Sequence, residues 1–177
     1  MFMPEPFTQE SLTDRHEHQT TLPFLNFLLS HSGFQGITPA ATIVYFDLDE
    51  TMFKRTGTSG STLIGRWRQD MPQTLDDLRQ RGFGTSILSS ANHEYINAAL
   101  EIYRQQFIAD PNEAFDDSLS TRDFDKLGGK HQALTAVAEL SSSQGKYAIF
   151  VDDATLHFEG DASFGFVNVP KDMQYKG

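Results

Sequence analysis

The stretch that decides the fold is residues 41–51, which reads ATIVYFDLDET. Its first half contains an unbroken apolar run, residues 43–46, that stops at Asp47. Such a run predicts a β-strand buried on both faces, as in a parallel sheet covered by helices. Side chains two positions apart on an extended segment share a face, so Asp47 and Asp49 are expected to point into the same site.

Two further apolar runs end in polar residues in the same way. Residues 86–88 end at Ser89, and residues 147–151 end at Asp152, which Asp153 follows. The carboxyl ends of the strands in an open α/β sheet line one crevice, where ligands bind. The sequence therefore predicts that these hydroxyl and carboxylate groups meet the two carboxylates of the first strand at one edge of a sheet.

Amphipathic segments separate the predicted strands. Apolar residues recur at helical spacing in residues 72–80, after a candidate N-cap at Asn92, and from Lys130 onward. A last strand is expected at residues 164–169, and a weaker signal indicates one near residues 114–119. This alternation of buried strands and amphipathic helices predicts an α/β fold with a three-layer, doubly wound parallel sheet.

The predicted organisation is one α/β domain over residues 38–177, preceded in residues 1–37 by an N-terminal arm and a short helix. A chain of 177 residues fits one domain with a sizeable core. Residues 22–29 form the apolar helical segment, which we expect to cap the edge of the domain. Residues 52–65 are rich in Gly, Ser and Thr and are predicted to form a flexible loop.

Composition excludes several classes of partner. The formal net charge is −10 and the pI is about 4.9, which argues against binding to a nucleic-acid backbone or to an anionic membrane. No apolar stretch is long enough to span a bilayer, and the N-terminus lacks the features of a signal peptide. We expect a cytoplasmic protein. Export by a route that needs no signal peptide is the alternative.

The predicted metal follows from the available ligands. The chain has no Cys, so a metal must be held by oxygen or imidazole ligands. A crevice that holds several carboxylates suits Mg²⁺. The sequence His16-Glu17-His18 does not place two imidazoles on one helical face, and we interpret it as part of a solvated arm.

The residues 47–51, DLDET, after an apolar strand resemble the DxDxT signature of phosphatases of the haloacid dehalogenase superfamily. Ser89 resembles the second motif of that family, Lys130 the third, and Asp152-Asp153 the fourth. The four elements occur in the family order and cover residues 41–170. The resemblance implies an enzyme, a phosphoric monoester hydrolase that works through an aspartyl-phosphate.

The resemblance also implies a role for each residue. Asp47 would be the nucleophile, and Asp49 would protonate the leaving oxygen and then activate water. Ser89, Lys130 and Thr51 would bind the phosphoryl group. The metal ligands would be the Asp47 carboxylate, the Asp49 main-chain carbonyl and Asp152, with Mg²⁺ as the cofactor, and Asp153 would hold a metal-bound water or orient Lys130.

Simpler interpretations remain open for some of these residues. Asp47 and Asp49 would then only terminate a strand and cap a turn, although burying two carboxylates without a cation is costly. Ser89 would cap the following helix, and Lys130 would be a solvated lysine in the first turn of its helix.

The spacing of the motifs bears on the substrate. Residues 52–88 between the first two motifs, and residues 91–129 between the second and third, leave little room for a folded cap domain. The resemblance then implies the capless class, whose open sites accept phosphorylated macromolecules. We expect a phosphoprotein carrying phosphotyrosine, phosphoserine or phosphothreonine. The alternatives are a phosphatase of small phosphate monoesters and a non-catalytic binding domain with the same fold.

Overall fold

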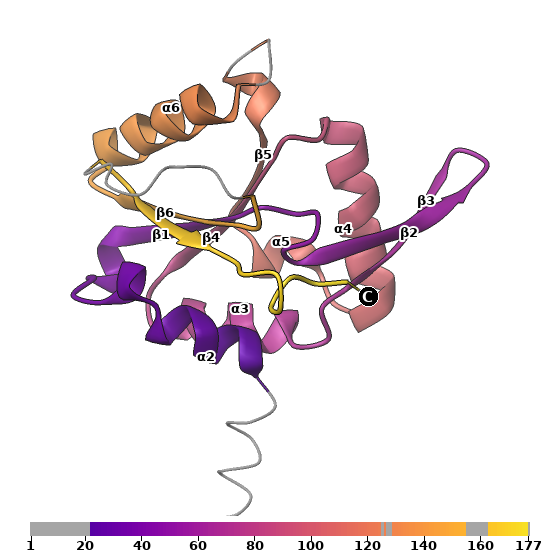
Figure 1. Ribbon diagram of the computed structural model, residues 1–177, viewed down its shortest axis with the longest axis horizontal. Coiled ribbons are helices and arrows are strands. Elements are labelled where there is room, and N and C mark those ends of the chain that lie inside the picture. The colour runs from indigo at the N-terminus through magenta and orange to yellow at the C-terminus, as the bar shows by residue number, and fades with distance from the viewer. Residues whose placement is uncertain (1–21, 125, 127–128, 155–162, 177) are drawn as a thin grey trace, which may run out of the picture.

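A five-stranded sheet with all strands parallel forms the centre of the computed structural model, which describes residues 22–124, 126, 129–154 and 163–176 (Figure 1). The strand order is β5-β4-β1-β6-β7. The strands are β1 (Thr42–Phe46), β4 (Gly84–Ser89), β5 (Asp117–Ser120), β6 (Tyr147–Asp152) and β7 (Gly165–Asn168). The predicted parallel α/β sheet is therefore confirmed, including its weak strand near residues 114–119. The chain builds outward from β1 in both directions, so the carboxyl ends of β1 and its two neighbours meet at the middle of one edge.

Helices cover both faces of the sheet (Figure 1). They are α2 (Pro23–Ser30), α3 (Met71–Gln80), α4 (His93–Phe107), the short α5 (Pro111–Ala114) and α6 (Lys130–Ser143), with 3₁₀ turns at Ser32–Phe34, Pro39–Ala41 and Thr121–Asp123. The helices predicted at residues 22–29, at residues 72–80, after Asn92 and from Lys130 are all present. Asn92 is the predicted N-cap, since its side chain accepts a hydrogen bond from the Tyr95 N–H at 2.9 Å.

The alternation of side chains along β1 divides the core between the two faces. Val44 and Phe46 are fully buried in the larger apolar cluster, which includes residues of α2, α3 and α4. Tyr45 points to the other face and joins the smaller cluster with Leu134 and Val137 of α6. The unbroken apolar run of β1 is thus explained by burial on both faces.

The short helix α2 is part of the core rather than a covering at its edge. Phe24 and Leu28 are fully buried in the larger cluster, and the ring of Phe24 lies 6.3 Å from that of Phe46. Residues 1–21 of the predicted arm, with His16-Glu17-His18, lie outside the described residues. Within the described residues, no helix is both long and apolar enough to cross a membrane.

The prediction of a flexible loop at residues 52–65 is wrong. These residues belong to an antiparallel hairpin, β2 (Phe53–Ser59) and β3 (Thr62–Trp67), which projects beyond the sheet (Figure 1). Ser59 pairs with Thr62, and the two residues between them form the turn, with Gly60 at a φ of 62°. Gly60, one of the glycines that indicated a loop, provides the positive φ of the hairpin turn, and Gly57 lies next to a shift in the pairing register of β2 with β3.

Trp67 anchors the base of this hairpin to α4. Its side chain is fully buried and donates a hydrogen bond to the carbonyl of Ala99 at 2.8 Å. The side chain of Gln106 bonds both the N–H and the carbonyl of Trp67, each at 2.9 Å. Trp67 is therefore a packing residue, and the hairpin keeps a fixed position relative to α4 at its base.

Candidate functional site

The pairing of β1 with β6 determines where the first and fourth sequence motifs meet. Phe46 is in register with Val151, and the Asp47 N–H donates to the Val151 carbonyl at 2.8 Å. The residue after each strand partner is an aspartate, so Asp47 and Asp152 come side by side at the carboxyl edge of the sheet. This follows from the parallel arrangement of two apolar strands that both end in Asp.

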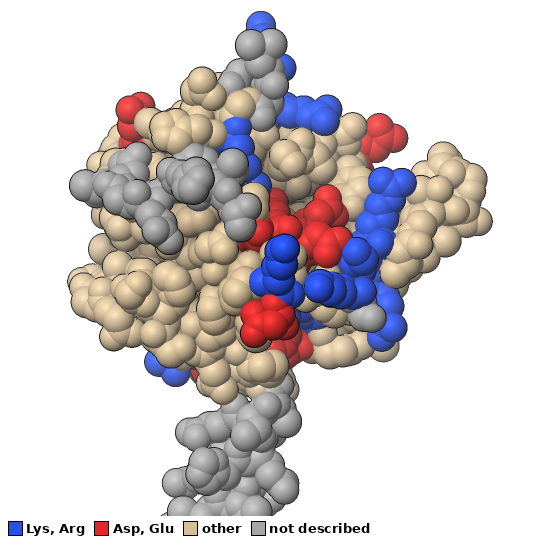
Figure 2. Space-filling view, viewed as in Figure 1, with Lys and Arg blue, Asp and Glu red and all other residues tan. Residues whose placement is uncertain are grey.

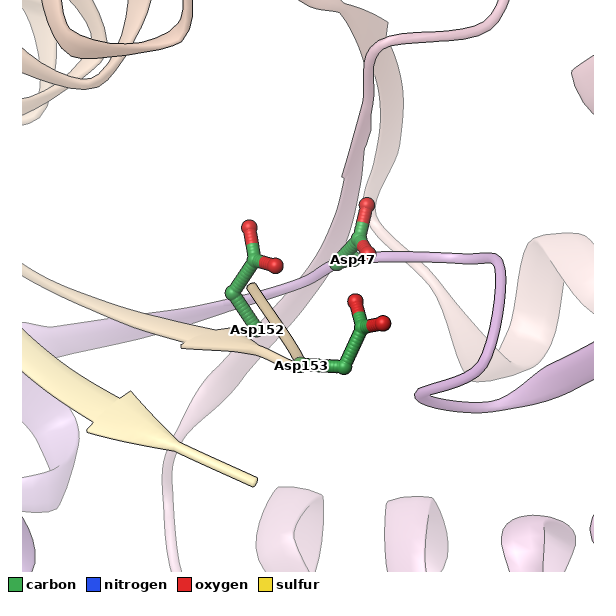
Figure 3. Close-up of side chains that lie close together, drawn as sticks. All are labelled: Asp47, Asp152 and Asp153. Carbon is green, nitrogen blue, oxygen red and sulfur yellow. The ribbon is translucent and has the colours of Figure 1, made fainter. Parts of the chain in front are cut away.

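Asp47, Asp152 and Asp153 form a compact group of carboxylates at this edge (Figure 3). One oxygen from each lies within 4.8 Å of the others. Asp47 and Asp152 are buried, with 7% and 3% of their surface exposed, whereas Asp153 is half-buried. Figure 2 shows acidic side chains near the centre of one face of the molecule, with basic side chains next to them.

Lys130, the first residue of α6, points into the carboxylate group. Its Nζ lies 3.7 Å from Asp47 Oδ1 and forms a close ion pair with Asp152. Burial acts to lower the pKa of Lys130, but the charges of Asp47 and Asp152 outweigh it and raise that pKa. The interpretation of Lys130 as a solvated lysine is wrong, since only 17% of its side chain is exposed.

The positive charge of Lys130 does not balance the negative charge of the three carboxylates. Burial raises the pKa of Asp47 well above its ordinary value, and the neighbouring Asp152 raises it further. Burial also raises the pKa of Asp152, although Lys130 and the Ala154 N–H, which donates at 2.9 Å, act against it. Three carboxylates and one ammonium carry a formal charge of −2 (three negative, one positive), which one divalent cation would balance.

This donor set fits the predicted metal. The group consists of carboxylate oxygens alone, and hard divalent cations such as Mg²⁺ prefer oxygen ligands. The structure brings together Asp47 and Asp152 of the predicted ligand set and adds the carboxylate of Asp153. The ligand atom expected from Asp49 is its main-chain carbonyl, and its carboxylate is not part of the group.

The Asp49 carboxylate lies beside the group and contacts α4 instead. It accepts a hydrogen bond from the Tyr95 hydroxyl at 2.6 Å. Burial raises the pKa of the Asp49 carboxyl, and the bond from Tyr95 acts in the opposite direction. A carboxyl with a raised pKa, held at one position by a tyrosine, is suited to donating a proton.

A tight turn after β1 places Asp49 and Thr51. The N–H groups of Met52 and Phe53 both donate to the Leu48 carbonyl, at 3.0 and 2.9 Å, and Glu50 adopts a φ of 65°. The Thr51 hydroxyl donates to Asp153 at 3.5 Å, which connects this turn to the carboxylate group. The sequence motif thus folds back on itself, with Thr51 bonded to the carboxylate group and Asp49 bonded to α4.

The buried guanidinium of Arg68 is hydrogen-bonded to the backbone of this turn. Its Nε donates to the Thr51 carbonyl at 2.6 Å, and its Nη2 donates to the carbonyl of Met173. The guanidinium carbon lies 4.4 Å from the centre of the Phe24 ring. Arg68 thereby joins the turn to α2 and to the C-terminal segment.

Ser89 lies at the end of β4 and is almost fully buried. Its hydroxyl oxygen accepts a hydrogen bond from the Ala91 N–H at 3.1 Å. Asn92 is the N-cap of α4, so Ser89 does not cap that helix. A serine hydroxyl can accept and donate at the same time, so Ser89 can also donate a hydrogen bond to a ligand.

Sequence reasoning missed two side chains of the site, Tyr95 and Arg68. Tyr95 is 46 positions from Asp49, and no local pattern indicates that their side chains meet. Arg68 follows a strand that was itself not predicted. Both act through contacts that exist only once the hairpin and α4 are placed against β1.

Comparison with protein-family models and with curated proteins finds no significant match for this chain.

Proposed function

We propose that this protein is a Mg²⁺-dependent phosphatase that hydrolyses phosphate monoesters by transferring the phosphoryl group to Asp47. The observation that carries the proposal is the meeting of Asp47, Asp152, Asp153 and Lys130 at the strand ends, with Asp49 beside them. The fold class would be the capless, haloacid dehalogenase type that the sequence motifs resemble.

In the first step, an Asp47 oxygen forms a bond to phosphorus while the ester bond to the leaving oxygen breaks. Asp49 gives its proton to that oxygen, so the leaving group departs as a neutral hydroxyl. In the second step, Asp49 takes a proton from water as the water oxygen attacks phosphorus. The bond to Asp47 then breaks and inorganic phosphate is released.

The other residues stabilise charge during these steps. Lys130, which lies 3.7 Å from Asp47, would neutralise negative charge on the nucleophile and on the phosphoryl group. Ser89 would donate a hydrogen bond to a phosphoryl oxygen, whereas the fully buried Thr51, whose hydroxyl donates to Asp153, would hold that carboxylate in position. Asp47, Asp152 and Asp153, with the Asp49 carbonyl, would hold Mg²⁺, whose positive charge permits a phosphate dianion to approach so many carboxylates.

The proposed substrates are phosphoamino acid residues of proteins. The hairpin and the first turns of α4 leave a groove on the Asp49 side of the site, where the leaving group must lie. Small phosphate monoesters are the competing substrate class.

The test is the turnover of p-nitrophenyl phosphate as a function of Mg²⁺ concentration. We expect activity that rises with Mg²⁺, disappears with EDTA and returns when Mg²⁺ is added in excess. Asp76→Asn, which changes an exposed acid on α3, is the control and is expected to behave like the wild type. Full activity after exhaustive chelation would contradict the proposal.

A further inference from the structure

A groove of about 230 Å³ lies between the hairpin and the first turns of α4. Arg55 and Leu63 line it from the hairpin, and Glu94 and Tyr95 line it from the helix. Tyr95 is shared with the site, because its hydroxyl donates to Asp49 at 2.6 Å. The groove therefore opens next to the carboxylate to which the proposed function assigns the leaving oxygen.

The hairpin side of the groove is basic in an acidic protein. Residues 53–67 contain Lys54, Arg55 and Arg66 and no Asp or Glu, although the whole chain has 24 acidic residues and 14 Lys and Arg. Lys54 is paired with Glu50 at 2.6 Å, whereas Arg55 is exposed and forms no ion pair with any described residue. Arg55 thus offers a guanidinium that is available to a ligand.

The charge of Arg55 also acts on the reaction site. Burial raises the pKa of Asp49 and of Tyr95, and the guanidinium of Arg55 partly offsets that effect on both groups. Arg55 lines the same groove as Tyr95, whose hydroxyl donates to Asp49, so an anionic group bound to Arg55 would lie on the leaving side of the phosphoryl group. Figure 2 shows basic side chains next to the acidic centre on this face.

The opposite wall carries a negative charge. Glu94 lines the groove from α4 without an ion pair to Arg55, so the two walls have opposite charges. An occupant must place an anionic group against the hairpin and a hydrogen-bond donor against the helix. A peptide residue with an acidic side chain meets both conditions, because its backbone N–H groups can face Glu94. A nucleic-acid chain does not, since it presents phosphates to both walls.

The size of the groove agrees with this occupant. Pockets for drug-sized ligands have volumes of about 300–1,000 Å³. A groove of about 230 Å³ is smaller, and it suits one amino-acid side chain with its backbone. Leu63 and Ala98 supply apolar surface for the methylene groups of that side chain.

We propose that this groove binds the residue adjacent to the phosphoamino acid in a protein substrate, and that Arg55 selects an acidic side chain at that position. The inference rests on the proposed function and specifies its substrate. A charge-assisted pair with an exposed arginine is weaker than a buried one, so the expected preference is about fivefold in kcat/KM.

The experiment compares phosphopeptides that differ only in the residue next to the phosphoamino acid. Glu, Ala or Lys is placed on either side, and kcat/KM is measured with Mg²⁺ for the wild type, Arg55→Glu and Arg66→Glu. The control Arg66→Glu changes the same charge on the neighbouring strand, at an exposed residue that does not line the groove. Circular dichroism and thermal unfolding establish that each variant folds.

We expect the wild type and Arg66→Glu to prefer Glu over Lys about fivefold on one side of the phosphoamino acid. Arg55→Glu should reverse that order on the same side. An unchanged order in Arg55→Glu, or an equal reversal in Arg66→Glu, would overturn the inference while leaving the phosphatase proposal intact. Faster turnover of a terminally phosphorylated oligonucleotide than of every peptide would also overturn it. Failure to hydrolyse p-nitrophenyl phosphate would instead reject the proposed function itself.

Discussion

The carboxylate group at the strand ends and the groove beside the hairpin are separated by one side chain, Tyr95, but they are built in opposite ways. Asp47 and Asp152 are buried and fixed by the register of two central strands. Arg55 is exposed and lies on a hairpin that projects from the sheet. Buried charges have a large energetic cost and large effects when altered, whereas exposed charges adjust selectivity by small amounts.

The largest effect is expected at the buried group. Asp47→Asn should lower kcat at least about a thousandfold, because no other residue replaces the nucleophile in covalent transfer. The measurement is steady-state hydrolysis of p-nitrophenyl phosphate by the folded variant, with Asp76→Asn as the control. Turnover of the folded variant near the wild-type rate would remove Asp47 from the mechanism.

The strands that carry the buried carboxylates are also the part of the fold that the sequence predicts best. An apolar run that ends in Asp indicates both a central strand and the position of its carboxylate, as for β1 with Asp47 and β6 with Asp152. The hairpin was not predicted, because Gly57 and Gly60 lie among small polar residues, and that local composition indicates a loop. Its anchors, Trp67 and Tyr95, depend on contacts between distant parts of the chain, and local patterns carry no information about them.

Gly65 tests how strictly the hairpin is specified. A Cβ at this position would clash with the ring of Phe53, which is fully buried against Trp67. Gly65→Ala should therefore destabilise the protein by about 2 kcal/mol, or roughly 4–8 °C in Tm. The control is Gly57→Ala in the same hairpin, where a Cβ meets nothing within 4 Å. Equal melting temperatures for the two variants would show that the packing around Phe53 does not constrain the hairpin.

Tyr95 connects the two regions, and removing its hydroxyl should have an intermediate effect. Tyr95→Phe should lower kcat about tenfold for phosphoserine peptides, whose alkoxide leaving group needs the proton from Asp49. For p-nitrophenyl phosphate, which has a better leaving group, we expect Tyr95→Phe to lower kcat by about threefold or less. KM should change little for either substrate, because the hydroxyl contacts Asp49 rather than the ligand.

Tyr103→Phe is the matched control, since it removes a hydroxyl from the same helix at a position packed against Trp67. It should leave both rates near those of the wild type. If Tyr95→Phe reduced the two rates equally, Tyr95 would not act through the proton donor.

The smallest expected effect is on stability and depends on pH. In the metal-free protein, burial raises the pKa of Asp47 in the folded state above its unfolded value. A raised carboxyl pKa means that the folded state binds more protons, so stability is lost as pH rises from the unfolded pKa through the folded one. Asn does not titrate, and Asp47→Asn should therefore gain stability relative to the wild type between pH 4 and pH 7, by about 1 kcal/mol or more.

Urea unfolding in EDTA at several pH values measures this difference. The Asp47→Asn and wild-type stabilities should converge near pH 4 and separate toward pH 7. Curves that remain parallel over this range would show that Asp47 carries no energetic cost when ionised. If the curves separate as expected, Asp47→Asn loses activity and gains stability at one position, which no exposed residue of the hairpin is expected to do.

The most direct test of the central claim is to identify the residue that carries the phosphoryl group. The wild-type protein is mixed with Mg²⁺ and p-nitrophenyl phosphate, quenched in acid during turnover, reduced with borohydride and digested for mass spectrometry. Borohydride converts an aspartyl-phosphate to homoserine, and we predict homoserine at position 47 only when Mg²⁺ and substrate are both present. Turnover without modification of Asp47, or with the modification at Asp49, Asp152 or Asp153, would contradict the account.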